Sequence, residues 1–181
     1  MAQHKLAHHE TRMSSFAQLY EEHLAYVFRY ISFRVGNHAM AEELTSTVFE
    51  KALAAFHRYD KEKAEPQTWL IAIARNTIID YFRKSAKRNT VPLENAFGVA
   101  SGDPSPQEEV ERKEEHQRLR FCLEALAQRE QEIVSLKFGA ELTNRRIASV
   151  LGLSENNVGT ILYRAVCKLR TCVKDWVNGK R

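Results

Sequence analysis

Side chains suited to reading DNA gather between residues 142 and 170, in the stretch LTNRRIASVLGLSENNVGTILYRAVCKLR. Asn156 and Asn157 carry amides that can each form two hydrogen bonds with an adenine edge, worth roughly 1–3 kcal/mol of discrimination. Arg164 and Lys168 follow at spacings that suit contacts with phosphates. The predicted chemistry is therefore sequence-specific binding of DNA.

A pair of short helices would position these side chains. Gly152 breaks the pattern of a first helix, and Ser154 is a good N-cap for a second, because its hydroxyl can accept an orphan backbone N–H. Apolar residues then recur every three or four positions, at Val158, Leu162, Ala165 and Leu169. This pattern predicts a helix-turn-helix, whose second helix would enter the major groove.

Composition limits the class of protein. The 181 residues include only 7 Gly and 4 Pro, which favours helices, and the net charge of +4 is a mild basic excess. No apolar run approaches membrane-spanning length, so we expect no membrane insertion and a cytoplasmic protein. Cys122, Cys167 and Cys172 fit no zinc or disulfide spacing; we expect reduced thiols, with Cys122 in the core.

Three helices are expected before residue 89. Residues 1–13 have the polar composition of a flexible tail, and apolar periodicity begins after Ser14 and continues to Gly36. A second helix is predicted over 39–57, a polar loop over 58–67, and a third helix from Thr68 into a basic cluster. In that third helix we expect Trp69 in the core and Asp80 paired with a neighbouring Arg.

The composition changes at Asn89. Three of the four prolines lie in the next two dozen residues, which predicts a linker over 89–113, and helical periodicity returns within 114–178. The predicted fold is all-α, with two small helical domains joined by a flexible linker: a three- to four-helix bundle over 14–88 and the helix-turn-helix over 114–178.

The motifs of both halves resemble one family. Residues 41–52 (AEELTSTVFEKA) and 68–83 (TWLIAIARNTIIDYFR) are similar to region 2 of the extracytoplasmic-function (group IV) sigma factors of bacterial RNA polymerase. Residues 123–130 (LEALAQRE), 147–154 (IASVLGLS) and the recognition helix resemble their region 4. The order, spacing and intervening linker match as well, over about 140 residues.

The resemblance implies that the second helix binds the polymerase core. The matching residues are Glu42, Glu43, Leu44, Ser46, Thr47, Val48, Phe49, Glu50 and Lys51. Ser46 and Thr47 depart from the Gln and Glu that the family often has there, so their polar contacts are expected to differ.

The loop and the third helix would hold the −10 element as a single strand, since bases that leave the stack are held by aromatic rings and positive charge. The residues expected there are Arg58, Tyr59, Asp60, Lys61, Lys63, Arg75, Asn76, Arg83, Lys84 and Lys87.

Region 4 would bind the duplex −35 element. The residues expected there are Arg145, Arg146, Ser154, Glu155, Asn156, Asn157, Thr160, Arg164 and Lys168. Arg146 departs from the acidic residue common in the family, and two interpretations stay open: an added contact to the DNA backbone, or a solvated side chain. The acidic linker is expected either to thread the RNA-exit path of the polymerase or to serve as a spacer.

The family implies an alternative sigma factor that directs promoter recognition, promoter opening and transcription initiation. Its partners would be the RNA polymerase core, promoter DNA and an anti-sigma factor. We expect no cofactor, no metal and no catalysis, because the chain has no phosphate-binding loop, HExxH or GxSxG motif. The alternative is a stand-alone helix-turn-helix regulator with a helical N-terminal domain, which would bind palindromic operators without polymerase.

Overall fold

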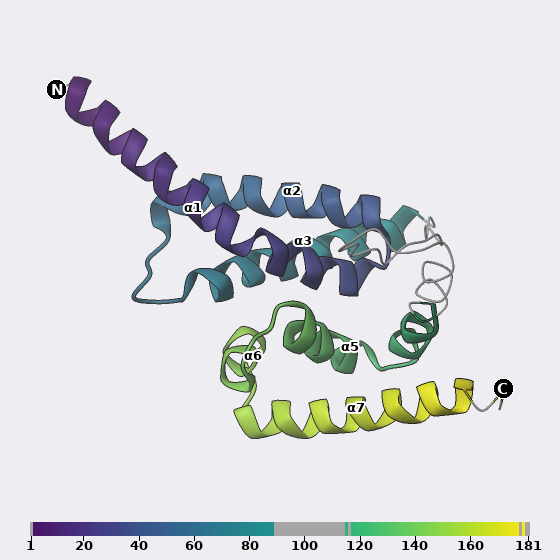
Figure 1. Ribbon diagram of the computed structural model, residues 1–181. Helices are drawn as coiled ribbons and strands as arrows, with labels where there is room; N and C mark the ends of the chain where they lie inside the picture. The colour runs from purple at the N-terminus through teal and green to yellow at the C-terminus, as the bar shows by residue number, and fades with distance from the viewer. Residues whose placement is uncertain (1, 89–114, 116, 178, 180–181) are drawn as a thin grey trace, which may run out of the picture.

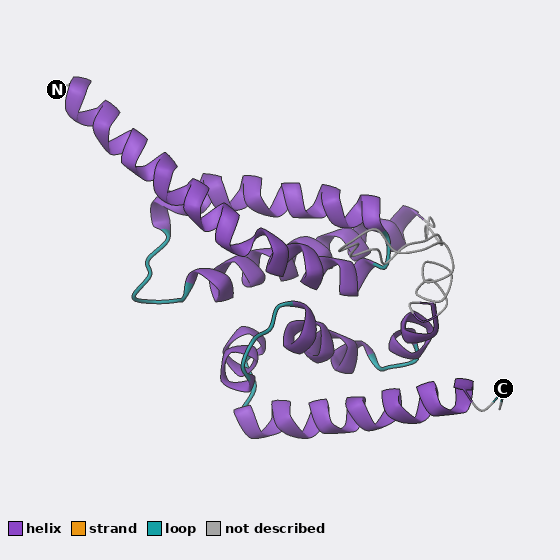
Figure 2. Ribbon diagram, viewed as in Figure 1, coloured by secondary structure: helices purple, strands orange, loops and turns teal. Residues whose placement is uncertain are grey.

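The computed structural model of the protein describes residues 2–88, 115, 117–177 and 179, and their side chains except those of 2–14, 87, 88 and 177. These residues form helices and connecting loops, with no strand among them (Figure 2). Within this part of the chain, no helix combines the length and apolar character needed to span a bilayer. The all-α prediction is confirmed.

The N-terminal half is a bundle of three long helices, α1 (Ala2–Val35), α2 (His38–Ala55) and α3 (Pro66–Arg88), with the short helix η1 (Phe56–Arg58) after α2 (Figure 1). Gly36 ends α1 with φ of 64°, a left-handed conformation that favours glycine. Asn37 then caps α2, its Oδ1 accepting from the Met40 N–H at 2.9 Å. The buried side chains follow the predicted faces and include Val27, Ile31, Leu44, Val48, Phe49, Leu70, Ala74 and Ile78.

Two helix starts differ from the prediction. α1 begins at Ala2 rather than at Ser14, so the backbone of the expected tail is helical; residues 2–13 contain neither Gly nor Pro to stop it. α3 begins at Pro66 rather than after Thr68, because proline tolerates the first helical position, where its missing N–H has no partner to lose.

The C-terminal half consists of a helix over 117–124, then α5 (Gln128–Val134), the π-helical turn η2 (Ser135–Gly139), α6 (Asn144–Leu151) and α7 (Glu155–Val177). Thr143 caps α6, Gly152 adopts φ of 64° at its C-cap, and Ser154 Oγ accepts from the Asn157 N–H. The predicted helix-turn-helix is therefore present.

The two halves share one hydrophobic core. Tyr30 and Ile31 of α1 belong to the same cluster of buried side chains as Ile133, Leu136 and Ile147 of the C-terminal half. A second, smaller cluster lies wholly within the C-terminal half and contains Leu126, Val134 and Ala165 as its buried members. The core of the C-terminal half is thus completed in part by contact with α1.

A disulfide contradicts the expectation of reduced thiols. Cys122 on the helix 117–124 is bonded to Cys172 near the end of α7, with a Cα–Cα distance of 5.7 Å and a sequence separation of 50 residues. Cys122 is 1% exposed, so its predicted place in the core is confirmed. The pairing was missed because a helical chain returning on itself brings together residues whose spacing matches no short motif.

Gly139 lies close to the backbone of α1. A Cβ built there would lie 3.0 Å from the Tyr30 Cα, whereas one at Gly159 in α7 would meet nothing nearer than the Asn144 amide at 3.7 Å. Gly139→Ala should therefore lower the unfolding free energy by about 1–3 kcal/mol through overpacking. The control Gly159→Ala should leave it unchanged or raise it by up to about 1 kcal/mol through helix propensity. Urea denaturation of both variants tests the difference, and equal midpoints would contradict it.

Candidate functional site

The face of α2 expected to bind polymerase divides into an outer and an inner side. Five of the predicted residues are exposed: Glu42, Glu43, Ser46, Glu50 and Lys51. Thr47 is half-buried, and its hydroxyl donates to the Glu43 carbonyl at 3.0 Å. Leu44, Val48 and Phe49 lie in the core, at most 7% exposed. These three hold α2 against the bundle, and the outer residues present most of the surface that a partner could contact.

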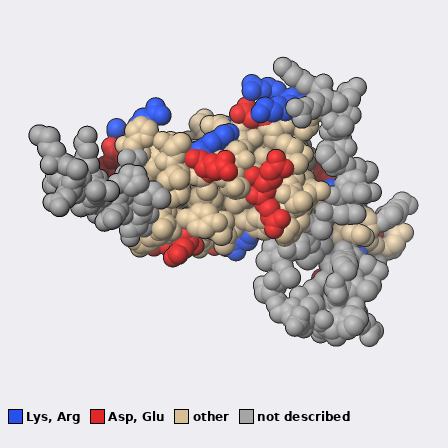
Figure 3. All heavy atoms as spheres, turned by 90° about the horizontal axis from the view of Figure 1, so that it is seen from above, with Lys and Arg blue, Asp and Glu red and all other residues tan. Residues whose placement is uncertain are grey.

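A groove runs beside that outer face, between α1 and α2. It has a volume of about 780 Å³ and an apolar floor that includes Phe16, Leu24, Phe28 and Phe49. Glu21, Glu42 and Glu50 line it as well. Figure 3 shows carboxylates standing among uncharged surface on the side of the molecule seen from above. The groove therefore suits an amphipathic helix with apolar and basic side chains.

The loop between α2 and α3 is held together by its own contacts. The Tyr59 ring stacks on Phe56 at 6.0 Å and lies 4.6 Å from the Trp69 ring, while its hydroxyl donates to the Ala64 carbonyl. Burial, with the Asp60 and Glu65 charges, raises the pKa of Tyr59. Tyr59 is thus engaged inside the molecule in this conformation, and Trp69 is packed against the core as predicted.

Charged residues follow on the same loop and on α3. Arg58, Lys61 and Lys63 are exposed, and Asp60 pairs with Lys63 at 3.3 Å. On α3 the side chains of Asn76, Arg83 and Lys84 are exposed; that of Lys87 lies outside the described side chains. Arg83 pairs with Asp80 at 2.9 Å, in agreement with the expected partner for Asp80.

The recognition helix α7 presents a polar stripe. The exposed residues along it are Ser154, Glu155, Asn156, Asn157, Thr160, Arg164 and Lys168, and Arg145 is exposed on α6. Tyr163, which the sequence reasoning missed, is 72% exposed beside Arg164. Its three-residue spacing from Thr160 was the available signal, since it places the ring on the same stripe.

Lys168 is bound within its own half. Its Nζ donates to both Glu130 oxygens, at 2.7 and 2.9 Å, and Glu130 also accepts from the Ala127 N–H that precedes α5. The Lys168 hydrogen bond is the largest cause of a lowered Glu130 pKa. This pair attaches the middle of α7 to the start of α5, so Lys168 has a structural contact that the sequence did not predict.

Polar contacts join the two halves at the candidate site. Arg75 Nε donates to Glu132 Oε1 at 2.7 Å, and Arg29 pairs with Glu141 at 2.6 Å. Arg146 pairs with Glu65 and reaches Gln67, whose amide donates to the Ala140 carbonyl at 2.6 Å. In this conformation Arg146 contacts the other half of the chain, and its contact with the DNA backbone stays a prediction.

Comparison with known proteins decides the family. Residues 19–88 match the model of sigma-70 region 2, and residues 116–169 match that of sigma-70 region 4. The chain belongs to the extracytoplasmic-function sigma factors. It is 32% identical to the ECF RNA polymerase sigma factor BldN of Streptomyces coelicolor over 89% of this chain and 61% of BldN. It is 29% identical to SigM of Bacillus subtilis over 89% of this chain and 96% of SigM.

Solved structures show the same fold. CnrH, in complex with the cytosolic domain of CnrY, superposes with a TM-score of 0.66 at 21% identity, over 90% of this chain and 89% of that one. The sigma factor RpoE of Bartonella quintana, in complex with the anti-sigma factor NepR, gives 0.72 at 18% identity, over 88% and 97%. The matches to both sigma-70 regions and to the relatives BldN and SigM assign this sigma factor to promoter-directed initiation of transcription.

Glu130 gives a pH-dependent prediction. Because its pKa is lowered in the folded state, its contribution is present at neutral pH and is lost as the pH falls through that lowered value. Glu130→Gln should reduce the unfolding free energy at pH 7 by about 1–3 kcal/mol, since hydrogen bonds to a charged group are lost.

As the pH falls below 5, the unfolding free energy of the variant should decrease less than that of the parent. Chemical denaturation across this range measures both effects. Glu155→Gln, at an exposed position of α7, is the control that should follow the parent. Parallel pH profiles for Glu130→Gln and the parent would refute this role of Glu130.

Proposed function

We propose that this sigma factor binds the polymerase core through the outer face of α2 and the adjoining groove. The acidic residues Glu42, Glu43 and Glu50 and the apolar floor of the groove support this assignment. The protein works in the cytoplasm, where the polymerase is, and has no catalytic activity of its own. Region 2 comprises residues 14–88, the linker 89–113 and region 4 114–178.

An anti-sigma factor competes for the same groove. CnrH and RpoE, which share this fold, are described in complexes with CnrY and NepR. An amphipathic segment with basic residues would bury its apolar face in the groove and pair with its carboxylates. Such a partner would exclude the polymerase by occupying its surface.

The downstream element is held as a single strand by the loop and by α3. The basic residues Arg58, Lys61, Lys63, Arg83 and Lys84 are exposed and suit the DNA backbone. Asn76 is exposed on the same helix and suits a base edge. Tyr59 would stack on a base only after its contacts with Phe56 and Trp69 have rearranged.

The upstream element is read by α7. The observation that carries this proposal is the pair of exposed amides, Asn156 and Asn157, at the N-terminus of a helix whose cap is made by Ser154. Thr160 and Tyr163 can contact thymine methyl groups, and Arg145 and Arg164 the phosphates. A stand-alone regulator would use the same helix, but the region 2 match and its docking face favour the sigma factor.

Engaging both elements requires the two halves to separate. Positions −10 and −35 are about 25 base pairs apart, or about 85 Å of duplex at 3.4 Å per pair. In the structure the two halves are in contact, an arrangement that we call closed. Arg146 of α6 there contacts Glu65 in the loop expected to bind the −10 element. The contacts between the halves therefore act against promoter binding, and the polymerase must stabilise an open form.

Run-off transcription with bacterial core polymerase and a library of randomised promoters tests the proposal. We expect transcripts whose templates share two spaced elements. Asn157→Ala should lower transcription from the selected promoter about 5- to 150-fold and relax the upstream element, since a bidentate adenine contact is lost. Lys174→Ala, at an exposed position near the end of α7, is the control. Duplex binding without polymerase and no transcript would favour the stand-alone regulator instead.

A variant of Glu132 tests whether its contact with Arg75 stabilises the closed arrangement. Its carboxylate is mostly buried between Arg75 and Arg129, at 2.7 and 3.4 Å. Glu132→Gln should weaken the contact with Arg75 and raise the open fraction about tenfold, because a charged hydrogen bond across the halves is lost.

Small-angle scattering should then give a larger radius of gyration for Glu132→Gln than for the parent. Asp80→Asn, whose partner Arg83 lies one turn away on the same helix α3, is the control. An unchanged radius for Glu132→Gln would mean that this ion pair does not hold the halves together.

A further inference from the structure

The disulfide joins the two ends of the C-terminal half. Cys122 lies on its first helix and Cys172 near the end of its last, so the covalent loop encloses α5, η2, α6 and the DNA-reading part of α7. Phe121 and Trp176, the neighbours of these positions, pack edge to face at 5.2 Å. The bond therefore constrains nearly the whole of this half.

The C-terminal half shares part of its core with α1. Ile133, Leu136 and Ile147 are buried in the cluster that includes Tyr30 and Ile31 of α1, while the separate cluster has only Leu126, Val134 and Ala165 as buried members. The proposed function requires this half to leave α1 at the promoter. It would then lose its contacts with α1 and would be held together by the packing among its own helices, the Lys168–Glu130 pair and the disulfide.

We propose that Cys122–Cys172 is a thiol–disulfide switch on promoter recognition, an inference that rests on the proposed function for its effect on transcription. The oxidised form keeps α7 packed against the rest of the C-terminal half after this half has separated from α1. The reason is that a bond across a 50-residue separation restricts the unfolded chain. Reduction by a dithiol removes that restriction and weakens binding to the upstream element. Disulfides in reducing compartments are usually transient and regulatory, which agrees with such a switch.

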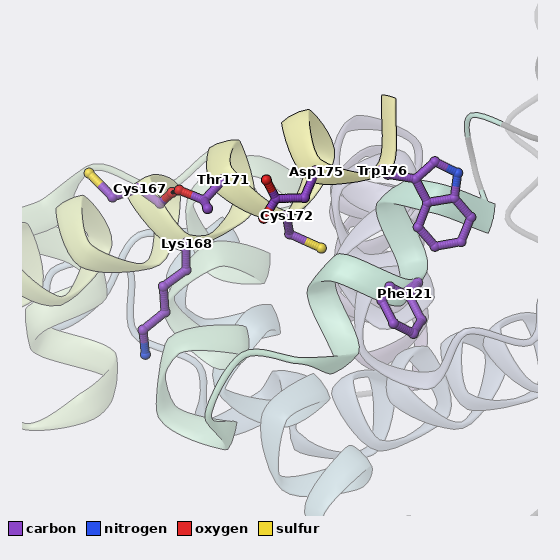
Figure 4. Close-up of a pocket in the computed structure, with 7 residues that line it drawn as sticks. All are labelled: Phe121, Cys167, Lys168, Thr171, Cys172, Asp175 and Trp176. Carbon is purple, nitrogen blue, oxygen red and sulfur yellow. Dashed lines mark hydrogen bonds between the residues drawn. The ribbon is translucent and has the colours of Figure 1, made fainter. Parts of the chain in front are cut away.

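The groove beside Cys172 gives a reductant access. Cys172 is half-buried and lines a hollow of about 790 Å³ with Phe121, Cys167, Asp175 and Trp176, whereas Cys122 is buried. Figure 4 shows the Cys172 sulfur directed toward the helix that carries Phe121, and the Cys167 sulfur directed away from it. Attack is therefore expected at Cys172, and Cys167, the free thiol, serves as the matched control.

The exchange is a two-electron reduction. One thiolate of the dithiol attacks Cys172 Sγ, the bond to Cys122 Sγ breaks, and Cys122 leaves as a thiolate. The second thiolate of the dithiol then attacks the dithiol sulfur that is bonded to Cys172, and Cys172 is released as a thiolate. The two protons from the dithiol pass to the cysteines, and the dithiol becomes a cyclic or intramolecular disulfide.

A first experiment does not depend on transcription. Alkylation of the full-length chain in denaturant, followed by mass spectrometry, should find one reactive thiol after oxidation and three after treatment with dithiothreitol. In a Trp69→Phe background Trp176 is the one remaining tryptophan. The denaturation midpoint followed by its fluorescence should fall on reduction and recover on reoxidation. Three thiols after oxidation, or an unchanged midpoint, would overturn the switch.

A second experiment measures recognition. Run-off transcription is compared on one promoter with an intact or a scrambled upstream element, with oxidised or reduced sigma factor. The ratio between the two templates should fall at least fivefold on reduction, and Cys167→Ser should behave like the parent. Cys122→Ser/Cys172→Ser should show the reduced ratio in both conditions, which controls for effects of the reductant on polymerase.

The outcomes separate the two proposals. A ratio that stays the same when the bond is shown to be reduced would overturn the switch while leaving the sigma assignment intact. Absence of promoter-specific transcripts in both redox states would instead count against the proposed function, and the thiol count and Trp176 midpoint would then decide the switch alone.

Discussion

The ion pair between Arg75 of α3 and Glu132 of α5 joins the two halves and constrains how they meet. Glu132 is 8% exposed and also receives Arg129 of its own half, so removing either arginine leaves a buried carboxylate less well compensated. Around it the Tyr30 side chain is fully packed, and that burial raises the pKa of its hydroxyl. The interface that buries Tyr30 thus also contains the ion pair that orients the two halves.

This interface couples stability to the proposed activity. Contacts such as Arg146–Glu65 and Gln67–Ala140 lie between the loop proposed for the −10 element and the domain proposed for the −35 element. A closed form is stable because it completes the core of the C-terminal half. An open form must be stabilised by polymerase and DNA, so recognition is linked to the presence of both.

Local signals in the sequence predicted the local structure. Gly36, Gly152 and Ser154 ended or capped helices as their chemistry requires, and the periodicity of apolar residues located the buried faces. Exposure of Asn156 and Asn157 followed from the same periodicity. These features depend on neighbours within about four positions, which a single sequence contains.

Long-range pairings were not predictable in this way. Arg146 meets Glu65 across 81 positions, Arg75 meets Glu132 across 57, and Cys122 meets Cys172 across 50. Each depends on how the halves fold back on one another. The engagement of Tyr59 by Phe56 and Trp69, and of Lys168 by Glu130, was missed for a different reason: a polar or aromatic residue suited to DNA is equally suited to a partner within the protein.

The distance between the halves, measured with and without the promoter, tests the central claim most directly. Fluorophores at Glu62 in the loop and Ser149 on α6, both exposed, would report it by energy transfer. The account predicts efficient transfer in the free protein and its loss when polymerase and a promoter are added, since the elements lie about 85 Å apart on duplex DNA. Efficient transfer that persists in a complex active in transcription would contradict it.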